Sequence, residues 1–264
     1  MFTNAELLWA FSLTLIAGLS TGIGALIVLL TNNQSKKFFS LGLGFSAGIM
    51  LYVSFMEILP SATSELQKNF EPKSAEILAV VAFFIGIGIS ALIDRLVPNE
   101  INPHELNVTA KDNALMKKAG IITAIAITVH NFPEGFATFL FSLSDPKTGI
   151  ILVAAIAIHN IPEGIAVALP ILAATKSKSK AFWISFLSGL AEPLGALVGF
   201  AVFSATIANG GFMGMAFATV AGIMVYVSLD ELLPASRIYG GGHYAILGVT
   251  MGMAVMAISL ILLT

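Results

Sequence analysis

The stretch AGIMLYVSFMEILP at residues 47–60 returns as AGIMVYVSLDELLP at residues 221–234. The two copies are identical at ten of fourteen positions, more than two unrelated apolar segments would share by chance. Each copy carries a glutamate three residues before a closing proline. The match predicts an internal structural repeat, and the apolar character of both copies raises the question of which solvent surrounds them.

The composition answers that the solvent is lipid. Of 264 residues, 57% are hydrophobic and 11% are charged, whereas about a quarter of an ordinary soluble domain is charged. The mean hydropathy is +0.92, which indicates an integral membrane protein in a lipid bilayer. The net charge of −2 and the lack of a basic stripe argue against nucleic acid as a partner. With no cysteine, any metal site must use nitrogen and oxygen ligands.

Eight windows of about twenty apolar residues are long enough to cross roughly 30 Å of hydrocarbon. They predict an all-α integral membrane protein with eight transmembrane helices in a single domain over residues 1–264. The one long connection, 98–117, joins the third helix to the fourth. The predicted windows are 7–30, 38–60, 75–97, 118–142, 149–173, 181–205, 212–235 and 244–263.

The distribution of lysine and arginine predicts the orientation, because cytoplasmic loops carry the excess of positive charge. Most of these residues fall at the odd-numbered connections, so both termini are expected outside and the loop 98–117 in the cytoplasm. No basic residue precedes Lys36, so the first window is interpreted as a retained span rather than a signal peptide.

Helices two and seven, which carry the repeated stretch, are predicted to cross the membrane in opposite directions. The same holds for helices four and five, which carry HNFPEG at 130–135 and HNIPEG at 159–164. Pairing of helices 2/7 and 4/5 is typical of an inverted-topology repeat, whose substrate site lies near the membrane midplane. This organisation favours a transporter.

The hexapeptides supply the chemistry. Residues four apart share one face of a helix, so His130 is expected beside Glu134 and His159 beside Glu163. A charged side chain at mid-bilayer costs roughly 2.5–3.5 kcal/mol if it is left unpaired. Because no lysine or arginine lies inside a predicted span away from its ends, a bound cation is the simplest counter-charge. Imidazole with carboxylate favours a borderline divalent ion such as zinc, iron, cobalt or nickel, and extends to manganese.

Other residues of the hexapeptides fit the same interpretation. Asn131 and Asn160 add amide oxygens next to each histidine. The proline at the fourth position cannot donate to the carbonyl four residues earlier, so both helices are expected to bend there. The glycine at the sixth position permits close approach of another helix or an ion. A metal site between helices four and five is therefore predicted.

Further acidic residues are weaker candidates. Glu192, in SGLAEPLG, is mid-span and expected to ligate, although a buried carboxyl bonded across helices is the alternative. Glu57 lies near a span end, where it is a ligand or simply reaches water. Asp230 and Glu231 are interpreted as gating or lining a pathway.

Elsewhere, structural explanations are preferred. Asp94 beside Arg95 is interpreted as a solvated pair at a helix end. The loop residues His104 and Glu105 could collect metal ions, but a single histidine is weak support for such a role. Two GxG patterns inside apolar spans, at 22–24 and 86–88, are interpreted as packing glycines rather than phosphate loops.

The eight spans, HNFPEG, HNIPEGIAVALP, SGLAEPLG and SLDELLP together resemble the ZIP (Zrt/Irt-like) metal transporters, in particular their bacterial ZupT-type branch. The resemblance covers essentially the whole chain. It implies a binuclear metal centre in helices four and five, a homodimer, and elevator-like movement of one helix bundle against the other.

Carried over residue by residue, the resemblance implies two metal positions. Glu134 and Glu163 would bridge them. The main position would comprise His130, Glu134, His159 and Glu163, with Glu57 of helix two facing it. The second would be completed by Asn131, Asn160 and Glu192.

The function expected is uptake of zinc, together with iron, manganese, cobalt and cadmium, across a bacterial plasma membrane into the cytoplasm. The metal would be cargo rather than a cofactor, and the protein would not be an enzyme. An intramembrane zinc hydrolase using the same ligands is the alternative, disfavoured because HExxH is absent. A second alternative is a channel that uses the same ligands without alternating access.

Overall fold

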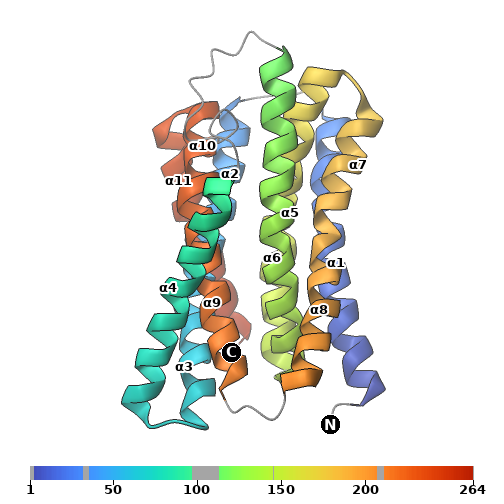
Figure 1. Ribbon diagram of the computed structural model, residues 1–264. Coiled ribbons are helices and arrows are strands. Elements are labelled where there is room, and N and C mark those ends of the chain that lie inside the picture. Colours follow the sequence, from blue (N-terminus) through green and yellow to red (C-terminus); the bar gives the residue numbers. More distant parts are fainter. Residues whose placement is uncertain (1–2, 32–35, 97–112, 145, 207–210, 264) are drawn as a thin grey trace.

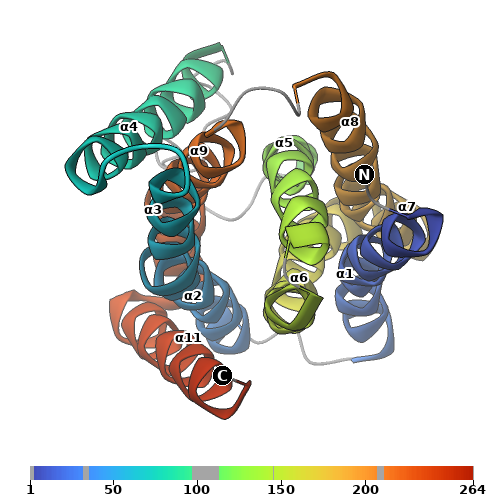
Figure 2. The same cartoon turned by 90° about the horizontal axis from the view of Figure 1, so that it is seen from below.

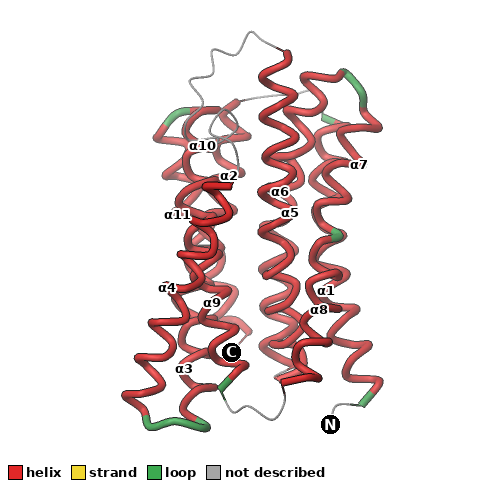
Figure 3. The backbone as a smooth tube through the Cα atoms, viewed as in Figure 1, coloured by secondary structure: helices red, strands yellow, loops and turns green. Residues whose placement is uncertain are grey.

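The computed structural model of the chain describes residues 3–31, 36–96, 113–144, 146–206 and 211–263. Within these ranges the chain forms helices joined by short connections and contains no strand (Figures 1 and 3). The predicted loop 98–117 lies outside the described residues as far as residue 112, and so do His104 and Glu105. The next helix begins at Asn113, inside the predicted loop.

Two of the helical labels, η1 and η3, denote single π-helical turns inside longer helices. The elements are α1 (Asn4–Leu30), α2 (Lys36–Val53), η1 (Ser54–Ile58), α3 (Leu59–Gln67), α4 (Pro72–Leu96), α5 (Asn113–Ser144), α6 (Pro146–Thr175), α7 (Lys178–Gly189), α8 (Ala191–Thr206), α9 (Phe212–Val227), η3 (Ser228–Leu232), α10 (Leu233–Gly240) and α11 (Gly242–Leu263).

In the described part of the chain, seven helical stretches are long and apolar enough to cross a membrane. The remaining predicted window, 118–142, falls in α5, a helix of 32 residues, and the eighth span stays a prediction. The seven stretches are Asn4–Leu30, Ser40–Gln67, Pro72–Arg95, Gly149–Leu169, Lys178–Ala201, Phe212–Arg237 and Gly242–Ile261.

The helices form two groups, seen end-on in Figure 2. The motif bundle contains both hexapeptides and consists of α1 and α5–α8. The repeat bundle contains both copies of the repeated stretch and consists of α2–α4 and α9–α11 with the two π turns. The bundles meet mainly where α2 contacts α6 and where α5 contacts α9.

Glycines set the close crossing of α1 and α6 in the motif bundle. A Cβ atom added to Gly24 would lie 2.0 Å from the carbonyl oxygen of Ile161. One added to Gly164 would lie 1.9 Å from the carbonyl oxygen of Thr21. Because no side chain fits at such distances, only glycine lets the two backbones touch.

The crossing of α8 and α5 has the same construction. A Cβ atom on Gly195 would lie 1.9 Å from the carbonyl oxygen of Phe132, and one on Gly135 would lie 2.0 Å from that of Glu192. Phe132 and Gly135 hold the places in the first hexapeptide that the contacting α6 residues hold in the second. The two hexapeptides are therefore packed alike against two different helices.

The repeat bundle contains a corresponding pair of crossings. A Cβ atom on Gly48 would lie 2.1 Å from the carbonyl oxygen of Val249, and one on Gly222 would lie 2.0 Å from that of Phe83. Gly48 and Gly222 hold the same place in the repeated stretch. Among the glycines predicted to pack, Gly88 is an exception, because a Cβ atom there would meet nothing within 4 Å.

Both copies of the repeated stretch also contain a π turn at the same place. The N–H of Leu59 bonds to the carbonyl of Ser54, and the N–H of Leu233 bonds to that of Ser228, five residues back in each case. The next residue in each copy is the closing proline, which has no N–H to donate. The wider turn lets the helix continue through the proline, and π turns of this kind frequently lie at functional sites.

Candidate metal centre

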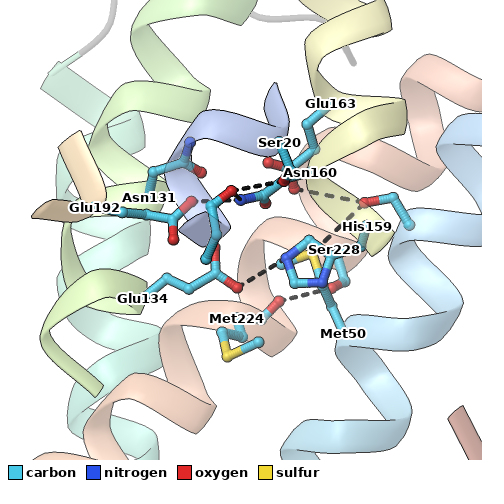
Figure 4. A network of polar contacts seen from close by, with 12 residues as sticks. Ser20, Met50, Asn131, Glu134, His159, Asn160, Glu163, Glu192, Met224 and Ser228 are labelled. Atoms are coloured by element: carbon cyan, nitrogen blue, oxygen red, sulfur yellow. Dashed lines mark hydrogen bonds and ion pairs between the residues drawn. The ribbon is translucent and has the colours of Figure 1, made fainter. Parts of the chain in front are cut away.

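Six of the eight predicted ligands lie together where α5, α6 and the start of α8 meet (Figure 4). They are Asn131, Glu134, His159, Asn160, Glu163 and Glu192, and none is more than 1% exposed. His130 belongs to α5, but its side chain is outside the described part of the structure.

The two hexapeptides are joined by an ion pair. His159 Nε2 lies 2.8 Å from Glu134 Oε1, and both side chains are buried. The four-residue spacing predicted a histidine and a glutamate side by side on each helix, whereas the described contact links α6 to α5. The imidazole and the carboxylate thus reach one point from two helices, as the ligands of a metal do.

A second contact joins α6 to α8. The Asn160 amide donates to Glu192 Oε1 and also to the carbonyl oxygen of Ala17, at 3.0 Å. Glu192 lies in the first turn of α8, which begins after the break at Leu190. In that turn the unpaired N–H groups favour a negative charge. The other carboxylate oxygen, Oε2, has no hydrogen-bond partner among the described residues.

Asn131 occupies the matching place on α5. Its amide donates to the carbonyl oxygen of Ser188, at 3.3 Å, while its Oδ1 has no hydrogen-bond partner among the described residues. A buried amide oxygen is ordinarily hydrogen-bonded. Since Oδ1 is an acceptor held in place by the bond of its own Nδ2, it is suited to contact a cation.

Glu163 lies where the two bundles meet. The hydroxyl of Ser46, on α2 of the repeat bundle, donates to Glu163 Oε1 at 3.5 Å. The other groups described so far all belong to the motif bundle. A movement of one bundle against the other would therefore break or form the contact at Glu163.

The repeat bundle adds side chains that the sequence did not single out. Figure 4 shows Met50 and Met224 beside the His159–Glu134 pair, and both methionines are fully buried. They hold the same place in the two copies of the repeated stretch. The AGIM sequence that both copies share is the pattern that could have pointed to them. A thioether is a soft potential ligand for a transition metal.

Glu57 is placed away from this cluster. It lies in η1, half-buried, and accepts a hydrogen bond from Ser61 at 3.4 Å. It follows Ser46 by eleven residues on one helix, or about 16 Å at 1.5 Å per residue. On the same helix, the side chain of Met50 lies beside the cluster (Figure 4).

A second acidic group lies in the repeat bundle. One carboxylate oxygen each from Asp94, Asp230 and Glu231 lies within 4.8 Å of the others, and all three residues are half-buried. Asp94, interpreted from the sequence as a solvated pair with Arg95 at a helix end, thus also lies close to two carboxylates of η3. A pocket beside them is lined by Asp94, Glu231 and the hexapeptide residue Pro133.

The amino-acid sequence of this chain is similar to those of known proteins. The family model described as "ZIP Zinc transporter" matches residues 5–114 and 100–260. "Zinc transporter ZupT" of Streptococcus mutans is 54% identical over 262 residues, which cover 98% of this chain and 99% of that protein. "Zinc transporter ZupT" of Chlorobaculum parvum is 53% identical over 264 residues, covering 97% and 98%. That of Corynebacterium glutamicum is 53% identical over 263 residues, covering 97% and 99%.

Proposed function

Since this chain belongs to the ZIP family of zinc transporters, we propose that it carries Zn²⁺ across the plasma membrane into the cytoplasm. The observation that carries the proposal is the buried cluster of Figure 4, in which imidazole, carboxylate and amide groups converge from several helices. A charged carboxylate costs about 2.5–3.5 kcal/mol on insertion scales at the centre of a membrane, and this cluster gathers three carboxylates around one imidazole. A bound divalent ion offsets that cost.

The metal centre is binuclear in this proposal. The main position comprises His130, Glu134, His159 and Glu163, and the ion pair of Glu134 with His159 supports it. Asn131, Asn160 and Glu192 complete the second position, supported by the Asn160–Glu192 contact, and Glu134 and Glu163 bridge the two. Because Glu57 is about 16 Å along its helix from Ser46, we assign it to the approach to the centre.

Transport proceeds by alternating access. The matching glycine crossings in each bundle support an inverted repeat that pairs α2 with α9 and α5 with α6, the arrangement that places substrate sites near the membrane midplane. The contact of Ser46 with Glu163 supports a motif bundle that moves against the repeat bundle. The pocket beside Asp94 and Glu231 is then the route by which the ion leaves.

The ligand set also suits other ions. Carboxylate and amide oxygens bind iron, manganese, cobalt and cadmium as well as zinc, so we infer a broad range of divalent cargo. The relatives named above are bacterial, and we propose the bacterial inner membrane, with both termini outside and a homodimer as the assembly.

The experiment is radiolabelled zinc uptake into liposomes that contain the purified protein. Glu163→Gln keeps the size of the side chain and removes its charge, so uptake should fall close to background. The matched control is Glu65→Gln, which changes a surface carboxylate paired with Lys68 and should leave uptake unchanged. Binding of zinc without uptake by the wild type would contradict the proposal, as would full uptake by Glu163→Gln.

A further inference from the structure

The segments of α1 and of α7–α8 at the centre correspond residue for residue, although helix one was not recognised as part of the repeat. AGLSTGIGAL at 17–26 aligns with SGLAEPLGAL at 188–197. Gly18 and Gly189 face one another: a Cβ atom on Gly18 would lie 2.5 Å from the Gly189 carbonyl oxygen, and one on Gly189 would lie 2.3 Å from the Gly18 carbonyl oxygen. Two equivalent residues contact each other in this way only at a pseudo-two-fold axis.

The asparagines of the two hexapeptides obey the same correspondence. Asn160 donates to the carbonyl oxygen of Ala17, and Asn131 donates to that of Ser188. Ala17 and Ser188 are equivalent in the alignment. The two halves of the centre are therefore held by the same backbone contacts, and a difference between them must come from side chains.

The main difference is at the position of Glu192, whose equivalent is Thr21. The Thr21 side chain is completely buried, and its Oγ1 would lie 2.8 Å from a Cβ atom on Gly189. Asn131 donates to the residue just before that glycine, so Thr21 and Asn131 flank the same peptide. On the other side, Asn160 likewise donates to the residue just before Gly18, and it also contacts Glu192.

In the described part of the chain, two buried oxygens on the Thr21 side make no hydrogen bond. Neither Thr21 Oγ1 nor Asn131 Oδ1 has a hydrogen bond among the described residues. A threonine inside a helix commonly bonds to the carbonyl four residues back, as buried Thr14 does with Ala10 at 3.0 Å. Since Thr21 does not, its hydroxyl remains available for a bound ion or for water in the ion's hydration shell.

We propose that Thr21 is the counterpart of Glu192 and, beside Asn131, supplies a neutral oxygen to the divalent metal of the second position. One side of the centre then carries a carboxylate and the other a hydroxyl. The hydroxyl contributes to binding without a fourth negative charge, which would hold a divalent cation more tightly and slow its release. This inference rests on the proposed function only in taking a divalent metal as the ligand.

The test compares Thr21→Val with Thr21→Ser. Valine keeps the shape of threonine and removes the hydroxyl, whereas serine keeps the hydroxyl and removes the methyl group. Thr21→Val should raise the KM for zinc uptake, and the Kd for zinc in detergent, about three- to tenfold, the usual worth of one hydrogen-bonding group. Thr21→Ser should stay close to the wild type. The matched control is Thr14→Val on the same helix, which should change neither constant.

An unchanged Kd for zinc in Thr21→Val would overturn the proposal. So would an equal rise of the Kd in the valine and serine variants, because that result indicates a packing role for Thr21. The Kd is measured at equilibrium, so it decides the role of Thr21 even if the wild type does not transport zinc. A double variant adds a second readout. Glu192→Thr should weaken zinc binding, and Thr21→Glu in the same chain should recover part of it by placing a carboxylate beside Asn131. Recovery supports the correspondence, and a properly folded double variant without recovery contradicts it.

Discussion

Replacing Gly135 by alanine should disable the centre without altering any charged group. A Cβ atom at this position would lie 2.0 Å from the carbonyl oxygen of Glu192, whereas ordinary contact begins at 3.4 Å. The obstruction is backbone, so no side chain can turn away and α8 must retreat from α5 by about 1.4 Å. That displacement carries Glu192 away from Asn160. Disturbing the groups that orient metal ligands typically costs about 10- to 100-fold in affinity or activity, and we expect zinc uptake to fall by a factor in that range.

The assay is initial zinc uptake into liposomes, measured with the melting temperature of each purified variant. Gly88→Ala is the matched control, because a Cβ atom there meets nothing within 4 Å in the described structure. It should keep both the uptake and the melting temperature of the wild type. Wild-type uptake by Gly135→Ala would refute the reasoning, since the crossing of α5 and α8 would then not position Glu192.

Asn131→Ala should change the KM or the order of preferred metals while uptake persists, because the amide belongs to the second metal position. If this variant is as inactive as Glu163→Gln, the division into a main and a second position is wrong. Asp94→Asn should lower the maximal rate of uptake more than it raises the KM, because we place this carboxylate on the exit route. Its control is Glu76→Gln, an exposed carboxylate on the same helix, and equal effects of the two variants on the maximal rate would contradict that role.

Much of the fold is predictable from hydropathy and from the fourteen-residue repeat. A run of about twenty apolar residues predicts a membrane span. Seven of the predicted windows coincide with helices of spanning length in the described chain. The π turns at η1 and η3 were not predicted, because a sequence shows the proline but not how the helix accommodates it. The correspondence of α1 with α7–α8 was missed because its decisive position differs, with Thr21 matching Glu192.

The sequence indicated which residue types gather in the candidate site, but not which side chains contact one another. The hexapeptides identified Glu134 and His159 by residue type, but their contact depends on how α5 crosses α6, which four-residue spacing on one helix does not contain. The resemblance implied that Glu57 faces the main position, and its place near a span end left open that it reaches water. It follows Ser46 by eleven residues, about 16 Å along one helix, and Met50 of the same helix lies beside the centre. Residue chemistry thus suggested ligands, while helix packing decides which of them meet.

The most direct test of the central claim is zinc uptake into liposomes loaded with unlabelled zinc, compared with empty liposomes. A carrier that alternates between two faces through the buried cluster predicts saturable uptake that internal zinc accelerates, and Glu134→Gln should abolish it. Uptake that rises linearly with zinc and ignores the internal metal, or that persists in Glu134→Gln, would contradict the account.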